Sequence, residues 1–257
     1  MKAIWILAVR EWRSLFLSPL AWSLLAVLFC ICAYMFNSGV AHYQINQMQF
    51  QAYGRGGTGP SLTDWTVTPL LGNAAILLLL ILPLITMRLI ADEKRRRTWP
   101  ALAASPISPT GIVLGKYLGL LLFLVVTVAL LGLMPATLFL YGNPDPGQVL
   151  AGLLGLFLVA ATFGAVGLAA SSATENPIVA AVATFGILLL LWIVAWMGES
   201  SGTGMDRILA YASLINHYEK FLHGIVSTAD LAYFILVSAG GLIFARQRLL
   251  AERLEGH

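Results

Sequence analysis

The chain has 257 residues, of which 59% are hydrophobic and 11% are charged, and its formal net charge is +3. Soluble domains are about 45–50% apolar and about 25% charged. A water-soluble globule of this length cannot hide so much apolar surface, because a large share of its surface must face water. The composition therefore excludes a soluble enzyme, a disulfide-stapled secreted domain and a disordered chain.

The first segment, residues 1–19, is amphipathic. Its apolar residues recur at helical spacing, and its charged residues fall mostly on the other side. This pattern predicts a helix that lies in the membrane interface before the chain turns at Ser18-Pro19. The alternative is an ordinary helical start of the first membrane span.

Six apolar runs follow, each long enough to cross a hydrocarbon core of about 30 Å as a helix. They predict an all-α integral membrane protein with transmembrane helices at residues 20–36, 70–90, 114–141, 149–170, 178–197 and 229–245. Residues 42–68 are polar and glycine-rich, and we expect an outer loop there. A second outer segment, 198–228, is expected to be re-entrant or helical, with a short helix near residues 205–222.

The positions of Lys and Arg predict the orientation. With the first residues inside, only Arg55, Arg207 and Lys220 fall outside, so 12 of the 15 basic residues (15 less 3) lie on the inner side. This asymmetry predicts a multi-pass protein of the inner (cytoplasmic) membrane with both termini in the cytoplasm.

The sequence offers little chemistry of its own. The expected spans lack the buried Asp, Glu or His relays of proton-coupled transporters. The nearest match to a phosphate loop is Gly111-Ile112-Val113-Leu114-Gly115-Lys116-Tyr117, but it is one residue short, and Tyr117 stands where Ser or Thr must bind magnesium. We interpret Gly111, Gly115 and Gly119 as a small-residue stripe for close helix packing. We predict no catalytic residue and no metal site.

The inner segment between the second and third spans is longer than a simple turn needs. It opens with the charged run ADEKRRR at 91–97 and then becomes apolar. One interpretation is a topology anchor attracted to anionic lipid. The other is a short helix that presents Trp99, Leu102 and Ala103 to a cytoplasmic partner.

Three stretches resemble the type-2 permeases of ABC transporters, in particular the gliding-motility branch. They are ADEKRRRTWPALAASPISPTGIVLGKYLG at 91–119, SSATENPIVAA at 171–181 and YASLINHYEKFLHGIVSTADLAYF at 211–234. Together with Arg10-Glu11 and Ser18-Pro19-Leu20 they cover almost the whole chain in order. Three positions depart from that pattern: Arg97 stands where the family often has glycine, Pro100 where it usually has glutamate, and Pro177 where glutamine is common.

The resemblance implies the ABC exporter type-2 permease fold, as a single domain over residues 1–257 with a cytoplasmic coupling segment at 91–113. It implies ATP-driven export across the inner membrane, with ATP and Mg bound by a separate ABC ATPase subunit and no cofactor in this chain. The expected partners are that ATPase, membrane lipid and a second permease chain in a homo- or heterodimer. An extracytoplasmic accessory subunit stays open, and no nucleic acid is expected.

The resemblance also implies roles for individual residues. Contact with the ATPase falls on Glu93, Arg95, Arg96, Thr98, Trp99, Leu102, Ser105, Glu175 and Asn176. Apart from the resemblance, we interpret His217, Tyr218, Glu219 and Lys220 as an outer gate or a docking site for an extracytoplasmic partner, for which a solvated helix face is the alternative. Asp230 is interpreted as a helix cap or an anchor at the membrane edge. As an alternative function, the chain could be a non-transporting scaffold or channel subunit that anchors partner proteins.

Overall fold

A computed structural model describes residues 2–52, 61–99, 107–198, 211 and 213–255, and all regular secondary structure within those ranges is helical. Six helical segments in this part of the chain are long and apolar enough to cross a membrane: Pro19–Phe50, Thr63–Arg95, Pro109–Leu140, Pro146–Ser172, Pro177–Val194 and Thr228–Leu254. The predicted all-α membrane protein with six spanning helices is confirmed.

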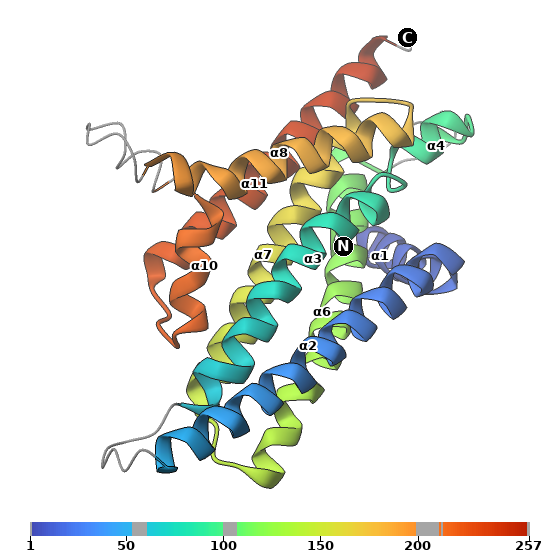
Figure 1. Ribbon diagram of the computed structural model, residues 1–257. Helices are drawn as coiled ribbons and strands as arrows, with labels where there is room; N and C mark the ends of the chain where they lie inside the picture. The colour runs from blue at the N-terminus through green and yellow to red at the C-terminus, as the bar shows by residue number, and fades with distance from the viewer. Residues whose placement is uncertain (1, 53–60, 100–106, 199–210, 212, 256–257) are drawn as a thin grey trace.

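Figure 1 shows the helices in chain order from blue to red. A short π-helical turn, η1, begins the second span and leads directly into α3. The elements are α1 (Lys2–Leu17), α2 (Pro19–Ala52), η1 (Thr63–Val67), α3 (Thr68–Thr86), α4 (Ala91–Arg95), α6 (Pro109–Tyr141), α7 (Pro146–Ser172), α8 (Pro177–Gly198), α10 (Leu214–Leu222) and α11 (Thr228–Glu255).

Several helices extend beyond the predicted spans. The helix α2 continues to Ala52, so the expectation of a loop from residue 42 is wrong for residues 42–52. Within this part the Asn46 amide donates to the backbone oxygen of His42 over 2.9 Å, one turn back. Hydropathy located the part of the helix that suits lipid, whereas backbone hydrogen bonding continues through polar residues. Of the short helix expected near residues 205–222, the structure shows α10 from Leu214 to Leu222, while residues 205–210 and 212 lie outside the described residues.

The helix α7 lies at the centre of the molecule and packs against α3, α6, α8, α10 and α11. Small residues let these neighbours approach closely. A Cβ atom at Gly155 would lie 2.5 Å from the Cβ of Phe221 on α10, and one at Gly167 would lie 2.6 Å from the Cβ of Thr86 on α3. The close packing of α7 against α10 and α3 therefore depends on glycine at these two positions.

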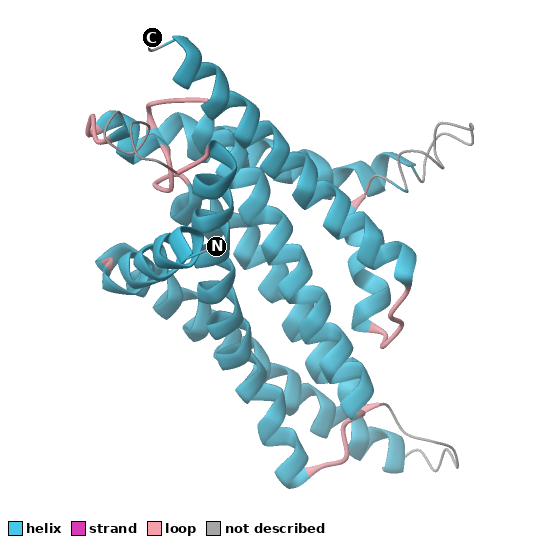
Figure 2. Ribbon diagram, turned by 180° about the vertical axis from the view of Figure 1, so that it is seen from behind, coloured by secondary structure: helices cyan, strands magenta, loops and turns pink. Residues whose placement is uncertain are grey.

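The helices differ in direction. In Figure 1, α3, α6 and α7 run along the bundle, whereas α8 runs across it. The same view places α4 and the C-terminal part of α11 at one end of the bundle. Seen from behind in Figure 2, the short helix α10 lies beside the first part of α11, which continues to the C-terminus.

Two neighbouring glycines of α11 give a direct test of the α7–α11 contact. We expect Gly241→Ala to lower the free energy of unfolding by about 1–3 kcal/mol, since its Cβ would lie 2.9 Å from the backbone oxygen of Ala165. Gly240→Ala has nothing within 4 Å and should change stability by less than about 1 kcal/mol. Denaturant titration in detergent micelles measures both, and equal effects would contradict the close contact.

Candidate functional site

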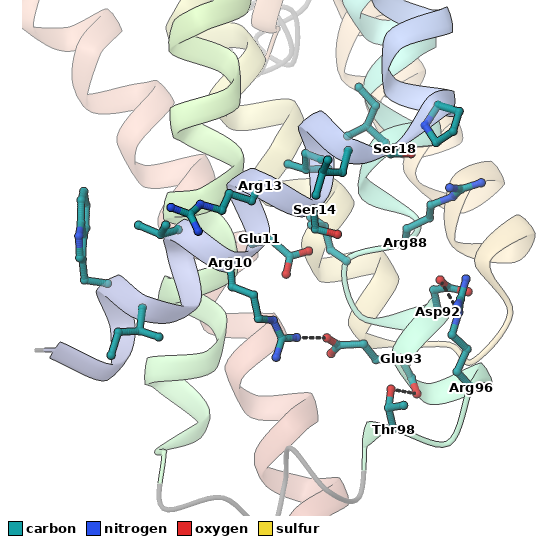
Figure 3. Close-up of a pocket in the computed structure, with 18 residues that line it drawn as sticks. Arg10, Glu11, Arg13, Ser14, Ser18, Arg88, Asp92, Glu93, Arg96 and Thr98 are labelled. Atoms are coloured by element: carbon teal, nitrogen blue, oxygen red, sulfur yellow. Dashed lines mark hydrogen bonds and ion pairs between the residues drawn. The ribbon is translucent and has the colours of Figure 1, made fainter.

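A cavity of about 1240 Å³ lies between α1, the end of α3 and the segment around α4. Figure 3 shows that charged side chains line it, from α1 on one side and from the segment around α4 on the other. Arg13 and Arg88 are exposed, and neither forms an ion pair within the described ranges. The other polar groups of its wall are Arg10, Glu11, Ser14, Ser18, Asp92, Glu93, Arg96 and Thr98.

Four charged side chains meet beside this cavity. The ammonium group of Lys116 on α6 lies 2.9 Å from Oε1 of Glu93 and 3.3 Å from Oε2 of Glu11. The guanidinium group of Arg10 lies 3.3 Å from the same oxygen of Glu93, an interaction drawn in Figure 3. Since the Lys116 side chain is only 1% exposed, its charge depends on these two carboxylates. The cluster connects α4 to α1 and α6.

The next residue along α4 makes a second connection. The Lys94 side chain is 4% exposed, and its ammonium group donates to the backbone oxygen of Ser172 at the end of α7. It also forms an ion pair with Glu252 of α11. Glu93 and Lys94 therefore connect α4 to different parts of the bundle.

A serine fixes the backbone where the chain enters α4. Oγ of Ser171 on α7 accepts from the backbone N–H groups of Ile90 and Ala91 at 3.1 and 3.0 Å. The same hydroxyl donates to the backbone oxygen of Met87. Helix ends leave such groups without partners in the helix itself, and here α7 supplies the missing partner.

The end of α4 has a left-handed residue. Arg97 has φ of 57°, and it is the only non-glycine residue with positive φ in the described part of the chain. The backbone N–H groups of Arg97 and Thr98 donate to the oxygens of Lys94 and Glu93, both at 3.0 Å. This is the Schellman pattern of helix termination, in which glycine is favoured. The conformation gives a physical reason for the glycine that the resembling permeases often have here.

The residues predicted to contact an ATPase lie at this end of the bundle, but they differ in exposure. Arg95, Arg96 and Thr98 are exposed, and Trp99 is half-buried against the core. The Glu93 side chain is only 19% exposed, since it faces Lys116 and Arg10. Leu102 and Ser105, together with Pro100, lie outside the described residues.

The second predicted contact is the turn between α7 and α8. Glu175 is exposed there. Asn176 begins α8, because its side-chain oxygen accepts from the backbone N–H of Ile178 at 3.0 Å. Since α4 packs against α8, this turn belongs to the same end of the molecule as α4.

The glycine stripe of α6 lies against α1. A Cβ atom at Gly111 would lie 3.6 Å from Cγ1 of Ile4 on α1, and one at Gly115 would lie 2.7 Å from Cδ2 of Leu7. At Gly119 it would lie 2.7 Å from the backbone oxygen of Ala8. The backbone approach of α1 to α6 places Glu11 beside Lys116.

The four predicted outer residues have divergent environments. His217 and Tyr218 are buried, whereas Glu219 and Lys220 are exposed, so the solvated-face interpretation is wrong for the first pair. The Tyr218 hydroxyl donates to the backbone oxygen of Leu71 at 2.9 Å, and burial raises the pKa of this phenol.

Asp230 is not the helix cap or membrane-edge anchor that the sequence suggested. It is completely buried, and its Oδ1 contacts both His217, at 2.5 Å, and Lys220, at 2.9 Å. Desolvation makes an isolated buried carboxylate costly, and the ammonium group of Lys220 and the hydrogen bond with His217 offset that cost. At the start of α11 the capping hydroxyl belongs instead to Ser227, which accepts from the backbone N–H of Ala229.

Sequence reasoning missed the charge pairs themselves. Lys116 was part of the rejected phosphate-loop match, yet it is fully buried between two carboxylates. One signal was available: Lys116 follows the expected start of an apolar span, where an unpaired charge is costly. Its partners Glu11 and Glu93 are 105 and 23 residues away, so the pattern could not identify them.

Comparison with protein families gives a match for this chain. The family model described as "ABC-2 family transporter protein" matches residues 36–217, which is more than half of the chain. The matched range begins within α2 and ends within α10, so it includes α4 and α7. Comparison with curated proteins gives no match.

Proposed function

Because the chain belongs to the ABC-2 family of transporter proteins, and is therefore a membrane permease component of an ABC transporter, we propose that it carries out ATP-driven export across the inner membrane. A separate ATPase subunit supplies the energy and binds at the α4 end of the bundle, on the cytoplasmic side. Two permease chains and two ATPase chains form the working unit. The resemblance noted above further favours the gliding-motility branch.

The connections of α4 carry this proposal. Glu93 connects α4 to α1 and α6, and Lys94 connects it to α7 and α11. A displacement of this segment therefore changes ion pairs with three helices, α1, α6 and α11, and a hydrogen bond with a fourth, α7. Such contiguous contacts are the means by which movement at one site biases distant helices.

The exposed side chains next to these connections supply the docking surface. Arg95 and Arg96 point outward from α4, and Trp99 follows as a half-buried aromatic residue. Arginine and tryptophan are enriched among the residues that dominate protein interfaces. We therefore assign Arg95, Arg96 and Trp99 as the contact with the ATPase, while Glu93 and Lys94 transmit its movement.

Charge reversal of the docking surface tests the proposal. We expect Arg95→Glu combined with Arg96→Glu to lower the amount of ABC ATPase that copurifies with the chain from its native membranes by about tenfold or more. The matched control is Arg246→Glu with Arg248→Glu, which reverses two exposed arginines on α11. Unchanged retention of the ATPase by the α4 variant, or no ATPase with the unaltered chain, would refute the proposal.

A further inference from the structure

The buried polar cluster between α10 and α11 does not take part in the ATPase contact. His217 of α10 has a side chain that is 4% exposed, and Asp230 of α11 is completely buried. The imidazole stacks on the ring of Tyr233, with centroids 4.1 Å apart and planes 20° apart. These contacts hold the imidazole ring in one orientation.

Both ring nitrogens of His217 face acceptors. Nε2 lies 2.9 Å from the backbone oxygen of Tyr211, and a carbonyl can only accept. Nδ1 lies 2.5 Å from Oδ1 of Asp230, which also accepts from the ammonium group of Lys220 at 2.9 Å. Only the imidazolium form carries a proton on each ring nitrogen, so only this form donates to both acceptors at once.

Loss of one proton breaks one of these two hydrogen bonds. If Nδ1 keeps its proton, the lone pair of Nε2 faces the lone pairs of the Tyr211 carbonyl. If Nε2 keeps its proton, the lone pair of Nδ1 faces the carboxylate of Asp230. A buried acceptor that loses its donor is costly, and Oδ2 of Asp230 and Oγ of Ser213 already have no partner in the structure.

Apart from α11, the described helices that pack against α10 offer no charged group that could replace the proton of His217. Besides α11, the helix α10 packs against α3, α7 and α8, and none of these three helices contains an ionisable residue. Among the residues that the structure describes, the remaining titratable groups on and next to α10 are Tyr218, Glu219, Lys220 and His223, with Tyr233 on α11 and Tyr211 before α10. The protonation state of His217 thus decides how α10 is held against α11 and the backbone of Tyr211.

We propose that His217 and Asp230 form a proton-binding site that holds α10 against α11 and against the backbone of Tyr211. With the proton bound, both hydrogen bonds of the imidazole are made and α10 is closed on the bundle. When the proton leaves, one bond is lost and α10 loosens. The opening of this part of the permease then depends on pH independently of ATP.

Thiol labelling of the full-length chain tests this site. Ser213→Cys places a thiol at a completely buried position next to α10, and Thr228→Cys provides an exposed reference in a second chain. Both are made after replacing Cys30 and Cys32 by alanine. The ratio of the two maleimide labelling rates removes the general increase of thiolate reactivity with pH, and the His217→Leu chain described below carries the same buried thiol as a control for its own pKa. We expect this ratio to rise about tenfold between pH 5 and about pH 9, the range around histidine titration.

A second variant distinguishes the effect of the bound proton from a general loss of stability. With His217→Leu, which cannot make either bond, the labelling ratio of the S213C chain should be high and constant across the same range. His223→Gln changes an exposed histidine of the adjoining turn and should leave the pH profile unaltered. A ratio that does not change with pH in the parent, or that is equal in the parent and in His217→Leu, would overturn the proposal.

Discussion

Replacement of Lys116 by methionine is expected to lower the free energy of unfolding by about 3–5 kcal/mol. The substitution keeps the length of the side chain but removes the cation that both Glu11 and Glu93 contact. The two carboxylates would then be held close together in a largely buried site. Denaturant unfolding in detergent micelles, followed by tryptophan fluorescence, measures the loss.

Two controls separate the ion cluster from a general effect of the substitution. Arg95→Met removes an exposed cation with no ion-pair partner in the described structure, and we expect a change within about 0.5 kcal/mol. Adding Glu11→Gln and Glu93→Gln to Lys116→Met should restore most of the lost stability, because no buried charge is left unpaired. An equal loss for Lys116→Met and Arg95→Met would show that the cluster does not stabilise the fold.

Substitution of Gly119 by valine is expected to separate α1 from α6. A Cβ atom there would lie 2.7 Å from both the backbone oxygen of Ala8 and the Cβ of Glu11. Because backbone atoms cannot move aside as a flexible side chain can, α1 must shift, at a cost of about 1–3 kcal/mol. The shift should also weaken the Glu11–Lys116 ion pair, since Glu11 faces the same glycine.

The matched control for this substitution is Gly186→Val in α8. A Cβ atom at Gly186 has nothing within 4 Å, so we expect little change in stability. A distance between α1 and α6 can be measured with a pair of spin labels in each variant. If Gly119→Val leaves both that distance and the stability unchanged, α1 does not pack on the glycine stripe as described.

The sequence predicted the spans well, because membrane insertion depends on the apolarity of about 20 consecutive residues. It was less informative about where helices end. The helix α6 begins at Pro109, five residues before its predicted span, with the hydroxyl of Ser108 accepting from the backbone N–H of Gly111. A serine followed by proline is a recognised start signal, so this boundary was available from local chemistry.

The buried charge pairs could not be predicted in the same way. The partners of Lys94 are Ser172 and Glu252, which are 78 and 158 residues away. His217 and Asp230 are only 13 residues apart, but a turn and two helix directions separate them. Hydropathy and local motifs do not contain such information, because pairing follows from how the helices pack.

The position of Glu93 and Lys94 next to each other on one short helix limits how that helix can move. Their side chains reach toward opposite neighbours, α1 with α6 for the acid and α7 with α11 for the base. Rotation of α4 about its own axis would pull at least one of these charges from its partner. Only a movement that carries the neighbouring helices along with α4 keeps both contacts, so force on α4 is expected to be passed on to α1, α6, α7 and α11 together.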